Sequence, residues 1–475
     1  MAMMGAVFRE RGLSVKAVDA AAFLVRDGES RVASALEGTK PDAVGISLIV
    51  GNASNAYSLI NKYISKLNIP VIAGGPHATI APDEALKHGV HVVVRGEGEE
   101  TGAELAEWLA GSRELEGIQG ISYLARDGSV RHNPDRPPIA NLDVLPMPDH
   151  DLFDASNYFE RPEDRVRAGK VITSRGCPNK CSFCANPIFG RKFRYRSPAS
   201  VVAELEMLKQ RYGIDRFEFL DDAFTASRRR LLDLAEELRR VPDVTFSCVT
   251  RLENLDGETV SALRAAGLYR AYIGVESARK ETLRRIHKNI ELEKLAPTLR
   301  LLRKNGIEAS LFFMFGFPWE SAEEMRETNR LIKKLRPLTA WFNEGGVVAP
   351  YPGTEIYEEY HESVGFTDWW LTHWRPSGYQ PLHPLQPYYF FPYDDEKRAA
   401  IREGLDIILQ HNRGEEDGGM AGKKGTGRQN IGQLLDIIHD LEEQVRDRDR
   451  QLHEFWNRSA LEKLRRIMQS LRGKK

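Results

Sequence analysis

Short apolar segments alternate with amphipathic ones along most of this 475-residue chain, and this alternation restricts the folds that it can adopt. In the first part, stretches with apolar residues at helical spacing, such as residues 55–67, separate four apolar runs: residues 14–20, 42–50, 69–75 and 91–98. Such alternation is typical of βαβ units, in which helices cover a parallel sheet. The sequence therefore predicts a Rossmann-like, doubly wound α/β domain over residues 1–135.

A second alternating series begins at residue 171. Amphipathic stretches again separate its six candidate strands, which are residues 171–174, 216–220, 244–250, 270–275, 308–316 and 339–348. Six successive βα steps predict a partial (βα)6 TIM-like barrel over residues 171–350, incomplete relative to the eight-stranded form. Chemistry in such barrels lies at the carboxyl ends of the strands, so polar residues there are the first candidates for a functional site.

Three of the four cysteines, Cys177, Cys181 and Cys184, lie in the stretch RGCPNKCSFCAN after the first strand of this second series. An odd number of thiols leaves one unpaired in a disulfide framework, whereas thiolates select zinc, copper(I) or iron–sulfur clusters. A structural zinc needs a fourth ligand, and the neighbouring residues offer none. The CxxxCxxC spacing therefore predicts a metal centre with one open position; a depleted zinc site and three unrelated core cysteines are the alternatives. Cys248, in mid-strand, is expected to be buried and inert.

The cysteine loop, with Phe183 just before its last cysteine, resembles the radical S-adenosylmethionine (SAM) superfamily. The likeness continues through FLDDAFT, TRLENLD, GVES, FGFP and PGT at the following strand ends. With GISLIVGN, GGPHAT and VVRGEGE in the first domain, the chain resembles radical SAM enzymes that carry an N-terminal cobalamin-binding domain. This group includes anaerobic magnesium-protoporphyrin monomethyl ester cyclase and class B methylases, and the likeness covers residues 1–360.

The resemblance implies a 4Fe-4S cluster on the three cysteines, whose open iron chelates the amino and carboxylate groups of SAM. Reductive cleavage of SAM then yields a 5′-deoxyadenosyl radical that removes a hydrogen atom from a small-molecule substrate, with an electron donor such as flavodoxin or ferredoxin. By the same resemblance, the cosubstrate contacts are assigned as follows: Asp221 or Asp222 to the amino group, Arg251 to the carboxylate, Glu276 and Ser277 to the ribose, and Phe183 and the backbone near Gly316 to adenine. Simpler roles stay open, because the two aspartates could cap the helix that begins near Thr225 and Arg251 could form a surface ion pair.

The first domain carries the residues that the resemblance relates to cobalamin, namely Ser47, Gly74 and Gly75. Glycines at strand ends permit close backbone approach to a ligand, although tight turns explain them equally well. Relatives that ligate cobalt through the protein carry an Asp-x-His-x-x-Gly segment, which this chain lacks. Residues 3–12 resemble the first helix, so we expect the domain to lack its first, central strand. His77 belongs to a different loop, and we expect it to contact its own neighbours.

The remaining segments complete the predicted organisation. Residues 120–132 predict a hairpin with its turn at Asp127 and Gly128. The other segments are a Pro-rich connector (136–170), an aromatic-rich cap that lines a substrate cavity or packs on the barrel (351–410), a flexible linker (411–430) and a coiled-coil-like helix (431–472). The heptad pattern of the last segment predicts pairing with another helix, in a homo-oligomer or a partner protein; folding back onto the barrel is the alternative.

Composition is typical of a globular protein, with a net charge of -1 and 28% charged residues, and gives no support to nucleic-acid binding. No apolar run approaches the roughly 18 residues of a membrane-spanning helix, and no signal peptide is recognisable, so we expect a cytoplasmic protein. Three hypotheses follow. The first is a cobalamin-associated radical SAM enzyme for C-methylation or radical rearrangement of a biosynthetic small molecule. The others are a radical SAM enzyme without functional cobalamin and a non-enzymatic scaffold assembled through the C-terminal helix.

Overall fold

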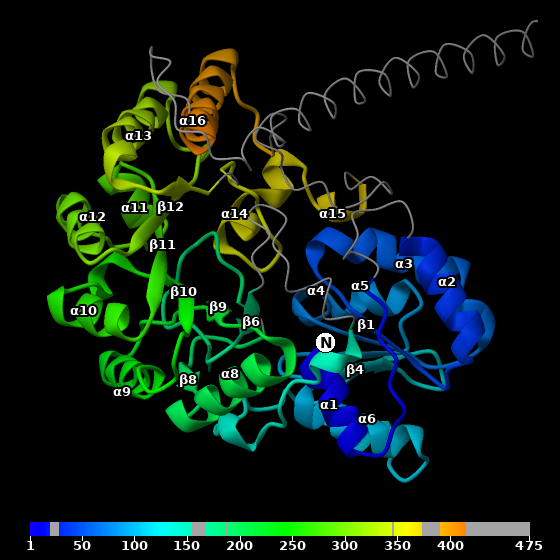
Figure 1. The fold of residues 1–475 in the computed structure, drawn as a ribbon. Coiled ribbons are helices and arrows are strands. Elements are labelled where there is room, and N and C mark those ends of the chain that lie inside the picture. The colour runs from blue at the N-terminus through cyan, green and yellow to red at the C-terminus, as the bar shows by residue number, and fades with distance from the viewer. Residues whose placement is uncertain (20–27, 154–167, 187, 344–345, 373–389, 415–475) are drawn as a thin grey trace, which may run out of the picture. The chain divides into compact units, whose positions relative to one another are not determined.

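The computed structural model describes residues 1–19, 28–153, 168–186, 188–343, 346–372 and 390–414, and all of these belong to one compact unit of the chain (Figure 1). Two larger sheets and a two-stranded ribbon organise the described residues. The predicted helix over residues 431–472 and most of the predicted linker lie outside them.

The N-terminal sheet has five strands in the order β1-β2-β3-β4-β5. These are β1 (Val44–Ser47), β2 (Val71–Gly74), β3 (Val92–Val94), β4 (Ile121–Leu124) and β5 (Val130–His132). The first three pair in parallel, and β4 and β5 add the predicted antiparallel hairpin. Its turn forms where expected, because the Asp127 carboxylate accepts the Ser129 N–H at 2.9 Å and Gly128 has a φ of 80°.

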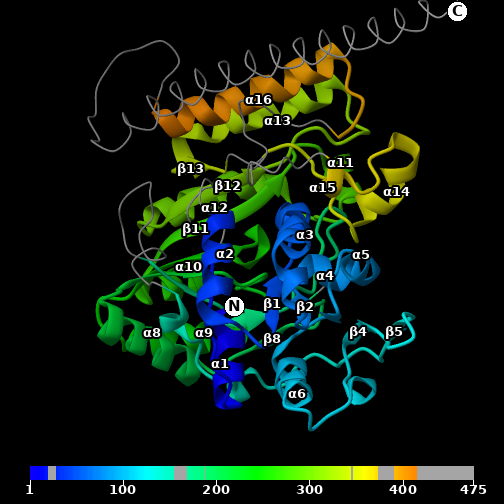
Figure 2. The same ribbon diagram turned by 90° about the vertical axis from the view of Figure 1, so that its right-hand side faces the viewer.

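Helices accompany this sheet, as Figures 1 and 2 show: α1 (Ala2–Glu10), α2 (Gly28–Thr39), α3 (Ala53–Lys62), α4 (Pro76–Ile80), α5 (Pro82–Lys87) and α6 (Glu99–Leu109). Helix α1 confirms the expected helix near the start of the chain and packs against α6, where Met4 lies close to Gly102. The predicted strand over residues 14–20 is wrong for residues 14–19, which adopt no strand. Among the described strands, β1 at the edge of the sheet pairs only with β2, so these residues add no strand to it. Instead, the Val15 carbonyl accepts a hydrogen bond from the Arg9 side chain at 3.4 Å.

The second sheet confirms the partial barrel. Its six strands are all parallel and lie in the order β13-β12-β11-β10-β9-β6. They are β6 (Gly169–Val171), β9 (Arg216–Phe219), β10 (Thr245–Thr250), β11 (Leu268–Glu276), β12 (Glu308–Phe313) and β13 (Trp341–Phe342). Helices α8 (Pro198–Tyr212), α9 (Arg228–Leu238), α10 (Gly257–Ala265), α11 (Lys280–Arg285), α12 (Leu295–Lys304) and α13 (Ala322–Leu335) lie between the strands in the sequence.

Buried aromatic side chains connect neighbouring barrel strands. Phe219 of β9 stacks on Phe246 of β10 with ring centroids 4.7 Å apart, and Phe224 joins them at 5.2 Å from Phe219. Each such side chain contributes about 1.5–3 kcal/mol through burial. Cys248, on the same face of β10 as Phe246, is 1% exposed, as expected for an inert core cysteine.

The predicted cap packs closely where it is described. It contains α14 (Glu355–Val364), α15 (Trp369–Thr372) and α16 (Asp395–Arg413), and α16 runs into the predicted linker. Helix α16 lies alongside α13 (Figure 2), where the Asn329 side chain donates to the Ala400 carbonyl at 2.9 Å. Trp369, Trp370 and Phe390 are buried, so packing is the observed role of these aromatics. None of the helices formed by the described residues has the length and apolar composition that crossing a membrane requires.

Candidate functional site

The three cysteines lie in a loop held by a small antiparallel ribbon. Its strands are β7 (Ser174–Arg175), which follows β6, and β8 (Arg194–Tyr195). Inside the loop, the Cys177 N–H donates to the Gly190 carbonyl at 3.1 Å, and the Cys184 N–H donates to the Cys181 carbonyl at 3.1 Å. Gly176 has a φ of 85°, and a Cβ there would collide with the Lys192 carbonyl. The loop therefore needs glycine at this position to close.

The cysteines form one electrostatic group beside the barrel edge. Burial raises the pKa of the Cys181 thiol, whereas the charges of Lys288 and Arg251 lower it. Cys184 keeps an exposed edge, yet desolvation by the surrounding atoms and the neighbouring thiols raises its pKa to about 11. Thiols in such surroundings keep their protons until a cationic metal replaces them.

The described residues give no support to a site for a single metal ion. No three of their His, Cys, Asp or Glu side chains gather closely enough to hold one. Three sulfurs around one zinc, at Zn–S lengths of about 2.3 Å, must lie within about 4 Å of one another. An iron–sulfur cluster accepts thiolates that lie further apart, because each one binds a different iron atom. The depleted zinc site therefore gains no support.

The Asp221 side chain is buried and bonded to the protein, which corrects its expected contact with the amino group of SAM. It is 2% exposed and accepts the backbone N–H groups of Thr173 at 2.5 Å and Ser174 at 2.8 Å. Burial raises its pKa, and the Arg230 guanidinium, 4.0 Å away, lowers it. Asp221 therefore fixes the turn between β6 and β7 and is not available to the amino group of a cosubstrate. The capping alternative is also wrong, since Ser227 caps α9.

Asp222, the next residue, has the opposite environment. Its exposed carboxylate accepts the Asn186 side-chain amide at 2.9 Å. Its negative charge contributes to the raised pKa of Cys184, so it lies beside the cysteine loop. Of the two aspartates, Asp222 is the one placed to contact a ligand at this edge.

Two cations and one buried carboxylate complete the barrel edge. Arg251, at the end of β10, donates to Glu253 at 2.7 Å and to the Lys288 carbonyl at 2.6 Å. Glu276, at the end of β11, pairs with the Lys288 ammonium at 2.9 Å, and both side chains are over nine-tenths buried. Glu276 has a φ of 69° at a register shift in β11, which turns its side chain away from regular strand geometry.

Lys288 is the functional candidate that the sequence did not reveal. It follows helix α11 rather than a strand, so no strand-end pattern marks it. Its neighbours His287 and Asn289 have φ values of 56° and 40°, and this left-handed turn brings the lysine back towards β11. No residue type in RIHKNI signals such a turn as clearly as glycine would.

The other residues assigned to the cosubstrate, Ser277, Gly316 and Phe183, each have different surroundings. Ser277 is fully buried and donates to Glu320 at 3.1 Å, which corrects its expected contact with a ribose. The Gly316 carbonyl accepts the Tyr393 hydroxyl, and a Cβ at Gly316 would lie 2.6 Å from that oxygen. Phe183 is half-buried and packs against the barrel core. The adenine contacts of Phe183 and Gly316 stay predictions.

At the N-terminal sheet, the three residues related to cobalamin do come together. Ser47 pairs in register with Gly74, and Gly75 follows with a φ of 107°. The exposed Ser47 hydroxyl has no hydrogen-bond partner among the described residues. A Cβ at Gly75 would lie 2.6 Å from the Leu48 carbonyl, so only glycine fits there. The close approach that requires glycine at position 75 is thus made by the protein's own backbone at this turn.

His77 is held inside its own surroundings, as expected. It is fully buried, its Nε2 lies 2.8 Å from a Glu84 carboxylate oxygen, and its ring packs edge-on against Trp370 at 5.3 Å. Tyr57 also donates to Glu84, at 2.9 Å. This network leaves the Nε2 of His77 engaged with the protein.

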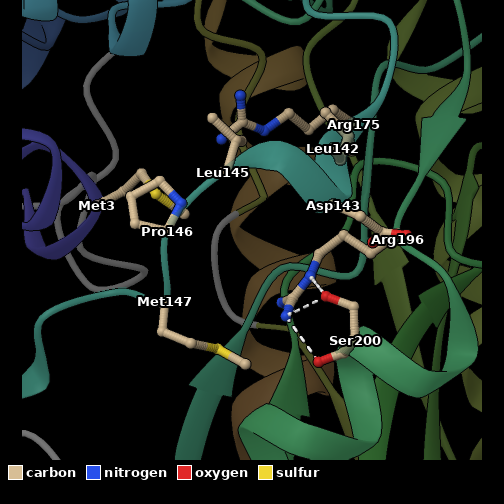
Figure 3. A pocket seen from close by; sticks show the side chains of 9 residues that line it. All are labelled: Met3, Leu142, Asp143, Leu145, Pro146, Met147, Arg175, Arg196 and Ser200. Carbon is tan, nitrogen blue, oxygen red and sulfur yellow. Dashed lines mark hydrogen bonds between the residues drawn. The ribbon is translucent and has the colours of Figure 1, made fainter.

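One cavity lies apart from these residues. Figure 3 shows it between Met3 of α1, the connector at residues 142–147, and Arg175, Arg196 and Ser200. Its volume is about 120 Å³, below the roughly 300 Å³ at which sites for drug-sized ligands begin. It contains none of the predicted site residues.

Comparison with known proteins agrees with this geometry. The model of the radical SAM superfamily matches residues 171–332, and that of the B12 binding domain matches residues 1–106. An uncharacterised methyltransferase from Pyrococcus horikoshii is 36% identical over 335 residues, which cover 69% of this chain and 71% of the relative. The chain belongs to the radical SAM superfamily. Its cysteine loop and strand ends are thus those of a radical SAM enzyme with a B12-binding domain, and membership implies a 4Fe-4S cluster and SAM.

Other radical SAM proteins are similar over much of their length. The anaerobic magnesium-protoporphyrin IX monomethyl ester cyclase of Rubrivivax gelatinosus is 29% identical over 72% of this chain, which spans only 62% of that cyclase. A radical SAM methyltransferase from Kitasatospora setae, solved with cobalamin and a 4Fe-4S cluster, matches with a TM-score of 0.64 at 21% identity, covering 77% of this chain and 74% of its own. That likeness supports the fold.

Proposed function

We propose that this radical SAM enzyme methylates carbon in a biosynthetic small molecule, with cobalamin as the methyl carrier. The observation that carries the proposal is the union, in one chain, of a B12-binding domain with the cysteine loop of a radical SAM barrel. The similarity to a methyltransferase supports methylation over other radical reactions. Rearrangement or ring closure is the second candidate, because the chain is also similar to a cyclase.

In this proposal, Cys177, Cys181 and Cys184 hold the cluster, which when bound supplies the electron that cleaves SAM. Asp222 is exposed beside the loop and accepts hydrogen bonds from the amino group of SAM. Arg251 pairs with its carboxylate, since the guanidinium retains further donors besides those given to Glu253 and Lys288. Glu276 accepts from the ribose hydroxyls, and Lys288, paired with that carboxylate at 2.9 Å, orients it.

The N-terminal edge takes the second cofactor. Ser47, Gly74 and Gly75 contact cobalamin, which when bound carries the methyl group between SAM and the substrate. His77 is not expected to ligate cobalt in this proposal, because it is fully buried and its Nε2 is held by Glu84. The cofactor is therefore bound through its periphery and through backbone contacts.

Anaerobic reconstitution with iron and sulfide tests the proposal. The reconstituted protein, given SAM and a strong reductant such as titanium(III) citrate, is expected to form both 5′-deoxyadenosine and S-adenosylhomocysteine, and to retain added cobalamin. Formation of 5′-deoxyadenosine alone, without cobalamin retention, would favour a radical SAM enzyme that has lost the second cofactor. Absence of a cluster spectrum in the wild type would refute both versions.

The interaction partners follow from the same proposal. We propose a small-molecule substrate, a cytoplasmic location and an electron donor such as flavodoxin or ferredoxin. A homo-oligomer or a partner protein would pair with the helix predicted over residues 431–472. If Cys181→Ala preserves the biological output while deletion of residues 431–475 abolishes it, the protein acts as a scaffold instead.

A further inference from the structure

Four buried charged side chains join the B12-binding domain to the ribbon that carries the cysteines. Glu97 and Glu99 lie between β3 and the first turn of α6, whereas Arg175 and Arg194 lie on β7 and β8. Each of the four is less than 9% exposed. We call them the four-charge cluster; they comprise two carboxylates and two guanidinium groups, which balance in charge.

The contacts within the four-charge cluster connect the region matched by the B12-binding model to the region matched by the radical SAM model. The Arg175 guanidinium donates to Glu99 at 2.6 Å and lies 3.5 Å from Glu97. Arg194 lies 2.5 Å from the other oxygen of Glu97. Glu97 also accepts the backbone N–H of Ile139 at 2.9 Å, and Arg194 donates to the Ile139 carbonyl at 2.6 Å. The connector is thereby included in the same network.

Both arginines also hold the cysteine loop directly. Arg175 precedes Gly176 and Cys177, so its position sets where the loop begins. Arg194 donates to the Phe189 carbonyl at 3.1 Å, and the Arg175 guanidinium lies 4.9 Å from the centre of the Phe189 ring. The network thus contacts the loop on the side where it leaves β7 and on the side where it returns to β8.

A buried set of paired charges is better suited to fixing a geometry than to adding stability. Apolar residues of similar volume often replace buried ion pairs without loss of stability, because desolvation offsets the attraction. The guanidinium groups, however, require acceptors in fixed directions, so these contacts form only within a narrow range of relative positions of the two elements. Chemistry at a site assembled from two domains depends on such placement, since a shift of about 1 Å can lower a rate about 100-fold.

We propose that the four-charge cluster sets the position of the cysteine loop relative to the B12-binding domain, and that Glu97, Glu99, Arg175 and Arg194 are positioning residues for the reaction. The inference rests on the proposed function, because it takes the cysteine loop as the seat of the 4Fe-4S cluster. The carboxylates belong to the region matched by the B12-binding model, and the arginines belong to the region matched by the radical SAM model. Each domain therefore supplies one sign of charge to the joint.

Amide hydrogen exchange, measured on the full chain before any cofactor is added, tests this placement. In Glu97→Gln, one charge-assisted contact to Arg194 is weakened, and exchange of the amides in residues 176–190 is expected to rise about tenfold. Exchange in β9 to β12 should stay at the wild-type rate. The matched control is Glu104→Gln, because Glu104 lies on α6 and pairs with Arg113 and Arg136, outside the four-charge cluster; it should leave residues 176–190 unchanged.

A second measurement distinguishes positioning from general support. After reconstitution, Glu97→Gln and Arg175→Lys are expected to retain wild-type iron content, while the electron paramagnetic resonance spectrum of the reduced cluster in the presence of SAM broadens. Wild-type exchange in residues 176–190 of a folded Glu97→Gln would overturn the inference, as would equal effects in Glu104→Gln. If Glu97→Gln does not fold, Glu97→Asp and Arg194→Lys, which keep the charges and change their reach, give the same comparison. Failure of the wild type to bind iron would refute the proposed function but leave the exchange result to decide this inference.

Discussion

The residues at the carboxyl ends of the parallel strands differ in chemistry between the two larger sheets. At the barrel edge, ionisable side chains are paired with one another, as in Glu276 with Lys288 and Arg251 with Glu253. At the carboxyl ends of β1 and β2 in the N-terminal sheet, the corresponding positions are Ser47, Gly74 and Gly75, which carry no charge. In the proposed function, the charged residues of the first edge bind SAM through side chains, and the uncharged residues of the second contact cobalamin.

Substitutions of the cysteines are expected to differ most from one another in their effects on iron content and SAM cleavage. Cys181→Ala removes a cluster ligand, so iron content should fall and SAM cleavage should drop by at least about 100-fold, more than the loss of an outer contact causes. Cys248→Ala is the matched control, because that thiol is buried in the core on β10. It should keep wild-type iron content and cleavage, measured by iron analysis and by 5′-deoxyadenosine formation. Equal losses in both variants would contradict the assignment of the loop.

The buried ion pair gives the next contrast. Lys288→Met leaves the Glu276 carboxylate buried without its partner, so the free energy of unfolding in urea should fall by about 3–5 kcal/mol. The double variant Glu276→Gln/Lys288→Met should recover most of that stability, while its KM for SAM should be higher than that of the wild type. The exposed Lys62–Glu29 pair of the N-terminal domain is the control, and Lys62→Met should leave the urea midpoint unchanged. A wild-type KM in the double variant would remove Glu276 from the cosubstrate site.

Asp221 and Asp222 are adjacent at the end of β9, and we expect the first to have a structural role and the second a binding role. Asp221→Asn places an amide against two backbone donors and leaves Arg230 without its counter-charge, so stability should fall by about 2–4 kcal/mol. Asp222→Asn should leave stability unchanged and raise the KM for SAM, because its carboxylate is exposed beside the loop. Urea unfolding and steady-state kinetics check the pair. Destabilisation by Asp222→Asn with unchanged kinetics would reverse the two assignments.

Local patterns in the sequence were sufficient for the six barrel strands and for three of the four strands expected in the first domain. Apolar runs separated by helical periodicity mark each barrel strand, and the residues that follow are then placed by the parallel topology. The same patterns could not distinguish Asp221 from Asp222, because which carboxylate turns inward depends on how β6 and β9 align. They also missed Lys288, which returns through a left-handed turn after a helix. The contact of Arg175 with Glu99 joins residues 76 positions apart, and no local period encodes it.

The edge of the N-terminal sheet offers the smallest expected effects and the sharpest test of its role. Gly75→Ala puts a Cβ 2.6 Å from the Leu48 carbonyl at a φ of 107°, so stability should fall by about 1–3 kcal/mol. Gly96→Ala is the matched control, since Gly96 has a φ of 73° with open space around its Cβ position; it adds backbone strain without the collision.

Ser47→Ala removes an exposed hydroxyl and should change stability by less than about 0.5 kcal/mol. Its effect should appear in equilibrium dialysis with cobalamin, as an affinity loss of about tenfold or less, the value of one hydrogen bond. Gly75→Ala should weaken retention further, because it alters the backbone between Ser47 and His77. Wild-type cobalamin affinity in both variants would show that this uncharged edge is not the cofactor surface, and the contrast between the two sheets would then have a purely structural origin.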